Sequence, residues 1–172
     1  LVGSSNQISV GAIVGWQQNG TIDGCMATGS IWTSGNGQGV GGIVGNLHKG
    51  TVQNCLSSVS IQASGQNAQV GGIVGLTKNN EIEIKSCAYV GTTLESIGSG
   101  AVGGIVGQQY NSKSLKIDNC YYDSDAAEKG LGETRANANK PVDNSMGVDD
   151  VNQEEYVCSL NQGEIVDGVC SC

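Results

Sequence analysis

Val40-Gly-Gly-Ile-Val-Gly45 is the stretch that decides the fold, because close copies of it begin at Val10, Val70 and Val102. The copies follow one another at intervals of 30, 30 and 32 residues. A second block ending in cysteine follows each copy: Thr21–Cys25, Thr51–Cys55, Ile84–Cys87 and Ile117–Cys120. A fixed period of this length is the sequence signature of a repeat architecture.

A third, weaker block completes the repeat. Ile31-Trp-Thr-Ser-Gly-Asn36 aligns with Ile61-Gln-Ala-Ser-Gly-Gln66. Leu1–Asn6 aligns with the same block and in the same register ahead of Val10. We therefore expect the first residues to belong to a repeat that upstream sequence or a neighbouring molecule completes.

Each repeat offers three short β segments separated by Gly, Asn and Ser, which are typical turn residues. At about 3.3 Å per extended residue, a 30-residue repeat has a contour of roughly 100 Å, which suits one turn of a three-sided parallel β-helix. Connections between parallel strands are right-handed in most proteins. A four-bladed propeller is the alternative, but its blades need about 40 residues. The prediction is an all-β, right-handed parallel β-helix (β-solenoid) of about four coils.

Stacking of the coils predicts ladders of equivalent side chains. Val10, Ile13 and Val14 each recur in the three later repeats, so they form aliphatic ladders, and those that point inward make the core. Ile22 and Cys25 also have a core character, although they are three positions apart, so that in one straight strand their side chains would point to opposite faces. A bend at Asp23-Gly24 would turn both side chains inward.

The repeated unit resembles the GLUG-motif repeats of bacterial surface adhesins, and similar repeats flank immunoglobulin-A-cleaving metallopeptidases. The resemblance covers four units over about residues 8–123, and Asn119-Cys-Tyr-Tyr-Asp123 is similar to the end of such an array. It implies a tail with a short helix before Leu-Asn-x-Gly, to which Ser159–Gly163 is similar. His-Glu-x-x-His does not occur in this sequence, so the resemblance does not imply peptidase activity.

Charge divides the chain of 172 residues, whose net charge is −8. Residues 1–117 carry four acids and five lysines, a net +1, whereas residues 118–172 carry twelve acids and three bases, a net −9. We therefore predict a repeat solenoid over residues 1–122 and an acidic C-terminal cap over residues 123–172, with a helix near residues 148–161. Neither part has the basic stripe of a nucleic-acid-binding protein, and no apolar run reaches the 18 residues of a membrane span.

Seven cysteines fall into two groups. Cys25, Cys55, Cys87 and Cys120 are expected to stack as a core ladder of small buried hydrophobic side chains, with disulfides between neighbouring coils as the alternative. The other three are disulfide candidates that would staple the cap: Cys158, Cys170 and Cys172. A zinc site is the alternative for these three cysteines, but a fourth ligand is missing, because His48 is distant in sequence.

Carboxylates do not form a convincing catalytic or metal site in the sequence. Asp23 and Asp118 occupy equivalent repeat positions but are three rungs apart, roughly 14 Å, which exceeds the 6.5–9.5 Å of an inverting glycosidase pair. Asp123, Asp125 and Glu128 lack the order of acids in a calcium-binding loop. We expect no catalytic residue, no cofactor and no metal.

Two further sets of residues suggest surface chemistry. Trp16, Trp32 and Tyr110 could provide stacking platforms for sugars, although they are scattered along the chain. Asn19-Gly-Thr21 is an acceptor pattern for N-glycosylation at Asn19.

Together these features predict an extracellular or cell-surface structural and adhesive module, not an enzyme. It would form a stiff rod for surface display or filament assembly. Its partners would be further copies of itself or adjacent repeats of a longer chain, together with surface glycans or host proteins. A carbohydrate-binding module is the alternative function, and a polysaccharide-cleaving β-helix enzyme is a more remote one.

Overall fold

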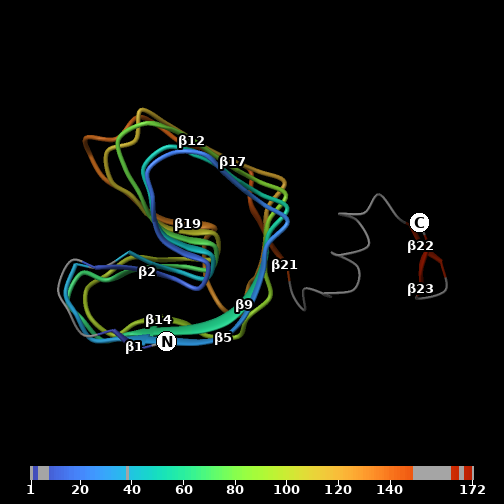
Figure 1. Ribbon diagram of the computed structural model, residues 1–172, viewed down its shortest axis with the longest axis horizontal. Coiled ribbons are helices and arrows are strands. Elements are labelled where there is room, and N and C mark those ends of the chain that lie inside the picture. The colour runs from blue at the N-terminus through green and yellow to red at the C-terminus, as the bar shows by residue number, and fades with distance from the viewer. Residues whose placement is uncertain (1, 4–7, 38, 149–163, 167–168, 172) are drawn as a thin grey trace.

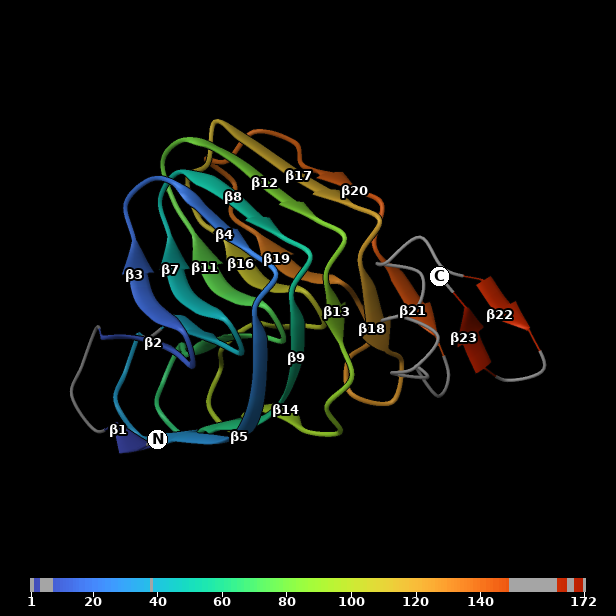
Figure 2. The same ribbon diagram turned by 45° about the vertical axis from the view of Figure 1, so that its right-hand side comes forward.

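The computed structural model describes residues 2–3, 8–37, 39–148, 164–166 and 169–171. Their regular structure consists of strands, and no helix occurs among them. The chain winds into a parallel β-solenoid of about four coils, in which each full coil passes through four sheets (Figure 1). Figure 2 shows the equivalent strands of successive coils lying side by side.

Four parallel sheets form the sides of the solenoid, and we name them sheets A to D. Sheet A contains β1 (Val2–Gly3), β5 (Met26–Thr33), β9 (Leu56–Ala63), β13 (Ala88–Tyr89), β14 (Leu94–Ser96), β18 (Tyr121–Asp123) and β21 (Met146–Val148). Sheet B contains β2 (Ser9–Gly11), β6 (Gly39–Gly41), β10 (Gln69–Gly71) and β15 (Val102–Gly103).

The other two sheets contain five strands each. Sheet C contains β3 (Val14–Gln17), β7 (Val44–Leu47), β11 (Val74–Thr77), β16 (Val106–Gln109) and β19 (Leu131–Thr134). Sheet D contains β4 (Thr21–Asp23), β8 (Gly50–Gln53), β12 (Glu81–Lys85), β17 (Ser114–Asp118) and β20 (Val142–Asp143).

The strand register confirms the predicted ladders. Val40 pairs with Val10 on one side and with Val70 on the other, and Val70 in turn pairs with Val102. The alignment of the first residues with the third block is also confirmed, because Val2 pairs with Trp32. The core runs along the axis through these ladders, and Ile43, Ile73 and Ile105 are completely buried in it.

The predicted cross-section is wrong in one respect: each coil has four sides, where three were expected. The stretch Val40–Gly45, one of the β segments expected in each repeat, is divided between sheets B and C by a sharp corner. A Cβ atom on Gly41 would lie only 2.0 Å from the carbonyl oxygen of Val44, so the chain turns there too tightly for any side chain. This corner directs Ile43 into the core.

The predicted bend between Ile22 and Cys25 is confirmed as a corner between sheets D and A. One residue of each coil adopts a left-handed backbone conformation there: Gly24 (φ 64°), Asn54 (φ 54°), Ser86 (φ 50°) and Asn119 (φ 48°). Glycine and asparagine tolerate this conformation better than most residues. The corner changes the side-chain alternation, and it turns the cysteine that follows toward the core.

The sheets continue beyond the predicted boundary at residue 122. β19, β20 and β21 pair in parallel with β16, β17 and β18, so a partial fifth coil extends to Val148. Leu131 pairs with Val106 and continues the valine ladder, although the Val-Gly-Gly-Ile motif is not repeated around it. The change in charge near residue 120 therefore does not mark the end of the solenoid.

Val148, the first residue of the helix predicted near residues 148–161, belongs to strand β21. Residues 149–163 lie outside the described part of the chain. Farther on, β22 (Glu164–Val166) and β23 (Val169–Ser171) form an antiparallel pair in which Cys170 lies opposite Ile165. Across the described residues, no helix is long and apolar enough to cross a membrane.

Candidate functional site

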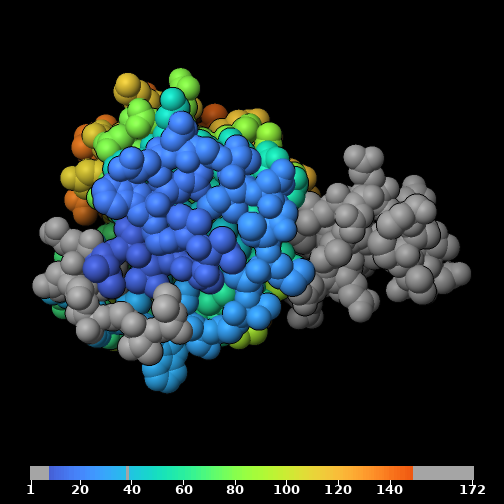
Figure 3. All heavy atoms as spheres, viewed as in Figure 1, coloured from blue at the N-terminus to red at the C-terminus, as the bar shows by residue number. Residues whose placement is uncertain are grey.

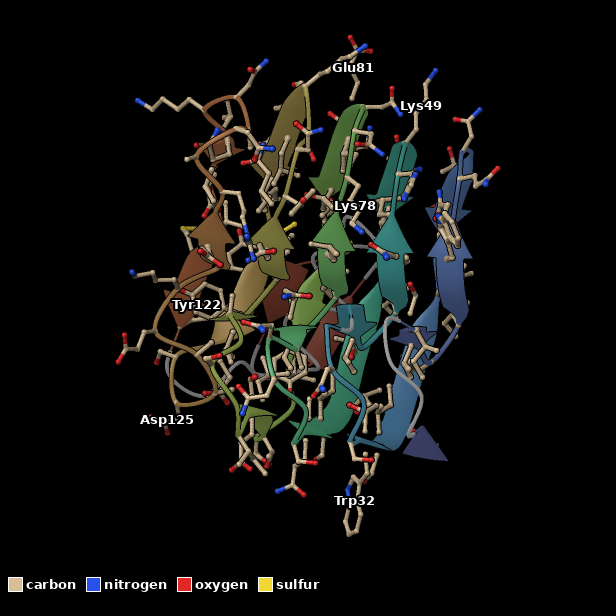
Figure 4. All side chains as sticks on the ribbon, turned by 90° about the vertical axis from the view of Figure 1, so that its left-hand side faces the viewer. Trp32, Lys49, Lys78, Glu81, Tyr122 and Asp125 are labelled. Atoms are coloured by element: carbon tan, nitrogen blue, oxygen red, sulfur yellow. The ribbon has the colours of Figure 1, made fainter. Side chains whose placement is uncertain are left out.

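A groove of about 1140 Å³ lies on the outer surface where sheets B and C meet. The sheets form a concave angle there, which Figure 1 shows between β2 and β19 on the left of the molecule. Figure 4 looks at this side, with Lys78 on a middle coil and Trp32 at the far lower edge. The coils stack along the groove, so residues distant in sequence line it together: Trp16, Asn46, His48, Lys78, Tyr110 and Arg135.

One rim of the groove is a column of side chains that follow the strands of sheet C. The backbone N–H groups of Lys78, Tyr110 and Arg135 each donate a hydrogen bond to a carbonyl oxygen of the preceding coil, at 2.9, 3.0 and 2.9 Å respectively. The N–H of His48 does the same toward Gln17 at 2.9 Å. These bonds place one rim side chain on each coil, about 4.8 Å from the next.

Aromatic and cationic groups alternate along this rim. The rings of Trp16 and His48 are 4.9 Å apart between centroids. Lys78 Nζ and the guanidinium carbon of Arg135 each lie 5.4 Å from the centre of the Tyr110 ring, a cation–π distance. Burial and the charge of Lys78 lower the pKa of His48, which favours the neutral imidazole at pH 7. The fixed positive charges of the rim are therefore Lys78 and Arg135.

Amide side chains line the groove beside this rim. Asn46 donates a hydrogen bond of 2.9 Å to the hydroxyl of Ser9, which connects sheet C to sheet B. Gln108 donates a hydrogen bond to the carboxylate of Glu133 on the next coil. No Asp or Glu lies among the described residues that line the groove, whereas Asn67, Gln69 and Asn79 add further amides.

Comparison with known families identifies the repeated unit. The family model described as the GLUG motif matches residues 6–31. The first coil therefore contains a GLUG motif, and the later coils repeat its sequence pattern. The matched GLUG unit runs from just before β2 into β5, and it thus corresponds to almost one coil of the solenoid. Neither the search of curated proteins nor that of solved structures finds a match.

Of the three aromatic residues that the sequence suggested for sugar stacking, two line the groove and the third lies elsewhere on the solenoid. Trp16 and Tyr110 come together on the groove although 94 positions separate them, and 56% and 38% of their surfaces are exposed. Trp32 is 59% exposed, but it lies on sheet A outside the groove. The sequence interpretation treated all three as scattered, because the corner between sheets B and C was not foreseen.

The aspartates weighed for catalysis remain separate. Asp23, Gln53, Lys85 and Asp118 form one column on sheet D, so the predicted register is confirmed and three rungs lie between the two acids. Asp118 forms an ion pair of 2.9 Å with Lys116, and that hydrogen bond lowers the pKa of Asp118. Hydrogen bonds of 2.8 Å from the Asn54 and Gln53 amides lower the pKa of Asp23. Both carboxylates stabilise the outside of the coils.

The acids considered for calcium do not surround a common point. The backbone N–H of Asp125 donates a 2.9 Å hydrogen bond to the Asp123 side chain, so the Asp123 carboxylate stabilises a local turn. Asp125 and Glu128 border a second, smaller cavity of about 580 Å³. Within the part of the chain that the structure describes, no three His, Cys, Asp or Glu side chains are placed to hold a metal ion.

The four cysteines of the GLUG coils are free thiols stacked at one corner. Cys55, Cys87 and Cys120 are fully buried, whereas Cys25 on the first coil is half-buried. Burial raises the pKa of the Cys87 thiol well above its ordinary value. Of the disulfide candidates, Cys158 and Cys172 lie outside the described residues, and only the backbone of Cys170 is described. The glycosylation candidate Asn19 is exposed in the turn between β3 and β4.

Proposed function

We propose that this GLUG-repeat chain is a non-catalytic structural module of the cell surface. In this proposal its right-handed coils, ended by a helix-containing cap, stack into a stiff rod that supports adhesion or assembles end to end. The partners are adjacent repeats of a longer chain or further copies of this one. The observation that carries the proposal is the exposed apolar surface of the first coil.

The first coil exposes side chains that the later coils bury. Ile13 is 46% exposed, whereas its equivalents Ile43, Ile73 and Ile105 are fully buried because another coil covers each of them. Val14, Ile22 and Cys25 are half-buried for the same reason. Figure 3 looks directly at this end of the solenoid, with the first coil facing the viewer. One more coil in register would bury this apolar surface, which favours association.

The backbone at this end is also open to pairing. Within the described residues, β2, β3 and β4 are edge strands that pair only with β6, β7 and β8. An uncovered strand edge is a template for another strand, and solenoid repeats rely on such contacts with their neighbours. A further coil stacked on this end would satisfy both the hydrophobic and the hydrogen-bonding groups.

The test is to insert a second copy of residues 10–69 in register before Val10. Two more coils would lengthen the solenoid by about 9.6 Å along its axis, measured by solution X-ray scattering. They would also increase the free energy of unfolding, because each coil adds an interface with its neighbour. Inserted coils that unfold separately, with no gain in stability, would overturn the stacking proposal.

The end-to-end form of the proposal is tested with Ile13→Lys. We expect the unchanged chain to associate into longer particles as its concentration rises, and the Ile13→Lys variant to remain monomeric in sedimentation velocity. Ile97→Lys is the matched control, because Ile97 is 68% exposed but lies on the side of the third coil. Surface display is tested separately, by the access of an added protease to the protein on intact cells.

A further inference from the structure

We propose that the groove between sheets B and C binds an extended, negatively charged oligosaccharide that runs along the solenoid axis. Its carboxylate or sulfate groups contact Lys78 and Arg135, and one of its sugar rings lies against Trp16. This site is separate from the coil ends on which the rod proposal depends.

Charge is the first argument for an acidic ligand. The protein carries a net charge of −8, yet the described lining of the groove contains two permanent cations and no carboxylate. The nearest acid in register with the lining is Glu133, whose carboxylate already accepts the hydrogen bond from Gln108. A guanidinium binds a carboxylate or a sulfate with two parallel hydrogen bonds, and an ammonium group binds either as a point charge.

Tyr110 sets the spacing of the two cations. Its ring lies between Lys78 and Arg135, each 5.4 Å away, so it is a spacer for the cations and not a sugar platform. The two cations belong to coils that are two rungs apart, about 9.6 Å. Acidic groups on alternate sugars of an extended chain can reach both, because one pyranose unit is comparable in length to one rung.

Trp16 provides the stacking surface. It is 56% exposed, and its ring contacts His48, whose lowered pKa favours the uncharged imidazole. Amides both donate and accept hydrogen bonds, so Asn46, Gln69 and Gln108 suit the hydroxyl groups of a polyhydroxylated ligand. Binding sites combine such an aromatic surface with a few polar groups that fix orientation.

An acidic peptide fits the groove less well. Extended peptides bind by adding a strand to a free sheet edge or by seating side chains in pockets, and acidic peptides are also recognised by clusters of arginines. The described lining of the groove contains a single arginine, Arg135. Here the groove is lined by sheet faces, whose strands are already paired with the coils on both sides from β6 to β11. The lining therefore offers side chains to a ligand and little backbone.

The test measures binding by isothermal titration calorimetry at low ionic strength. The probes are hexagalacturonate, a heparin hexasaccharide, a neutral galactose hexasaccharide and hexaglutamate. We expect at least one acidic oligosaccharide to bind about tenfold or more tightly than the neutral one and hexaglutamate, with affinity falling as salt is added. The proposal is overturned if neither acidic oligosaccharide binds, or if hexaglutamate binds as tightly.

Matched variants locate the site. Lys78→Gln and Arg135→Gln should each weaken binding about tenfold, whereas Lys49→Gln, next to the rim residue His48, should leave it unchanged. Trp16→Ala should weaken binding severalfold, whereas Trp32→Ala, an equally exposed tryptophan outside the groove, should not. Thermal unfolding of each variant establishes that it is folded. Equal losses in the control variants would place binding elsewhere and overturn the proposal.

Discussion

The hydroxyl oxygen of Tyr89 lies 3.0 Å from the carbonyl oxygen of Val59, one coil earlier. It also lies 3.0 Å from the carbonyl oxygen of Thr93, so its one proton is shared between two acceptors. The tyrosine is completely buried, and burial raises the pKa of its hydroxyl. This side chain joins two coils from inside the solenoid and holds the segment that separates β13 from β14.

Replacing Tyr89 with phenylalanine should destabilise the protein. Tyr89→Phe keeps the ring but removes the donor from the buried carbonyl group of Val59 and from the half-buried carbonyl group of Thr93. We expect the free energy of unfolding to fall by about 1–3 kcal/mol in urea titrations. Tyr121→Phe is the control, because its hydroxyl donates to Asn119 on the surface. A loss as large in Tyr121→Phe would contradict the role assigned to the buried bond.

Gly104 should tolerate no side chain. A Cβ atom at this position would lie 2.2 Å from Cγ of Tyr122, so Gly104→Ala must displace a ring in the core. We expect a loss of about 1–3 kcal/mol in the free energy of unfolding. The first coil already has Ala12 at the equivalent, exposed position, and Ala12→Gly should change stability by less than about 0.5 kcal/mol. Comparable losses in the two variants would refute the proposed steric cause.

The cysteine ladder predicts graded reactivity toward iodoacetamide. In the folded protein Cys25 should be alkylated slowly, because it is half-buried and burial raises its thiol pKa. Cys55, Cys87 and Cys120 should react only in denaturant, because they are fully buried. Trypsin cleavage after the intervening lysines puts each of the four cysteines on a separate peptide for mass spectrometry. Native labelling of Cys87 at the rate of Cys25 would show that the core opens.

Stability should decrease in acid. The folded-state pKa values of Asp23 and Asp118 lie below their ordinary value of 3.8, so both carboxylates stabilise the folded state above that pH. The contribution is lost as pH falls through the lowered values. Urea midpoints measured from pH 6 to pH 2 should therefore decline below about pH 4, and Asp118→Asn should flatten this decline. Added salt should weaken the part that depends on Lys116. An unchanged profile in Asp118→Asn would contradict this account.

The period and register of the solenoid could be predicted, because equivalent residues such as Val40 and Val70 recur at a fixed interval. The number of sides could not, since the corner at Gly41 depends on a close backbone approach that no residue pattern announces. The fifth coil was missed for a related reason. Leu131 preserves the ladder through size and position, while the motif that surrounds it has changed.

The candidate binding groove could not be predicted from the sequence. Trp16 and Tyr110 are recognisable as exposed aromatics, but their common location depends on the angle between two sheets. Lys78 and Tyr110 occupy equivalent positions in the repeat alignment, but Arg135 belongs to the fifth coil, whose sequence departs from the motif, so the sequence does not place it on the same rim. By contrast, the separation of Asp23 and Asp118 follows directly from the register, and the structure confirms it.

The one-to-one pairing of Val10, Val40 and Val70 has a consequence for how such a protein changes over generations. Unequal recombination between the gene segments for two coils would remove or duplicate a whole coil and would rejoin identical corners. Each product would preserve the hydrogen bonding of every sheet. The number of coils in the solenoid could thus change by whole coils over generations. The outer side chains of each coil could meanwhile be selected independently of those on the other coils.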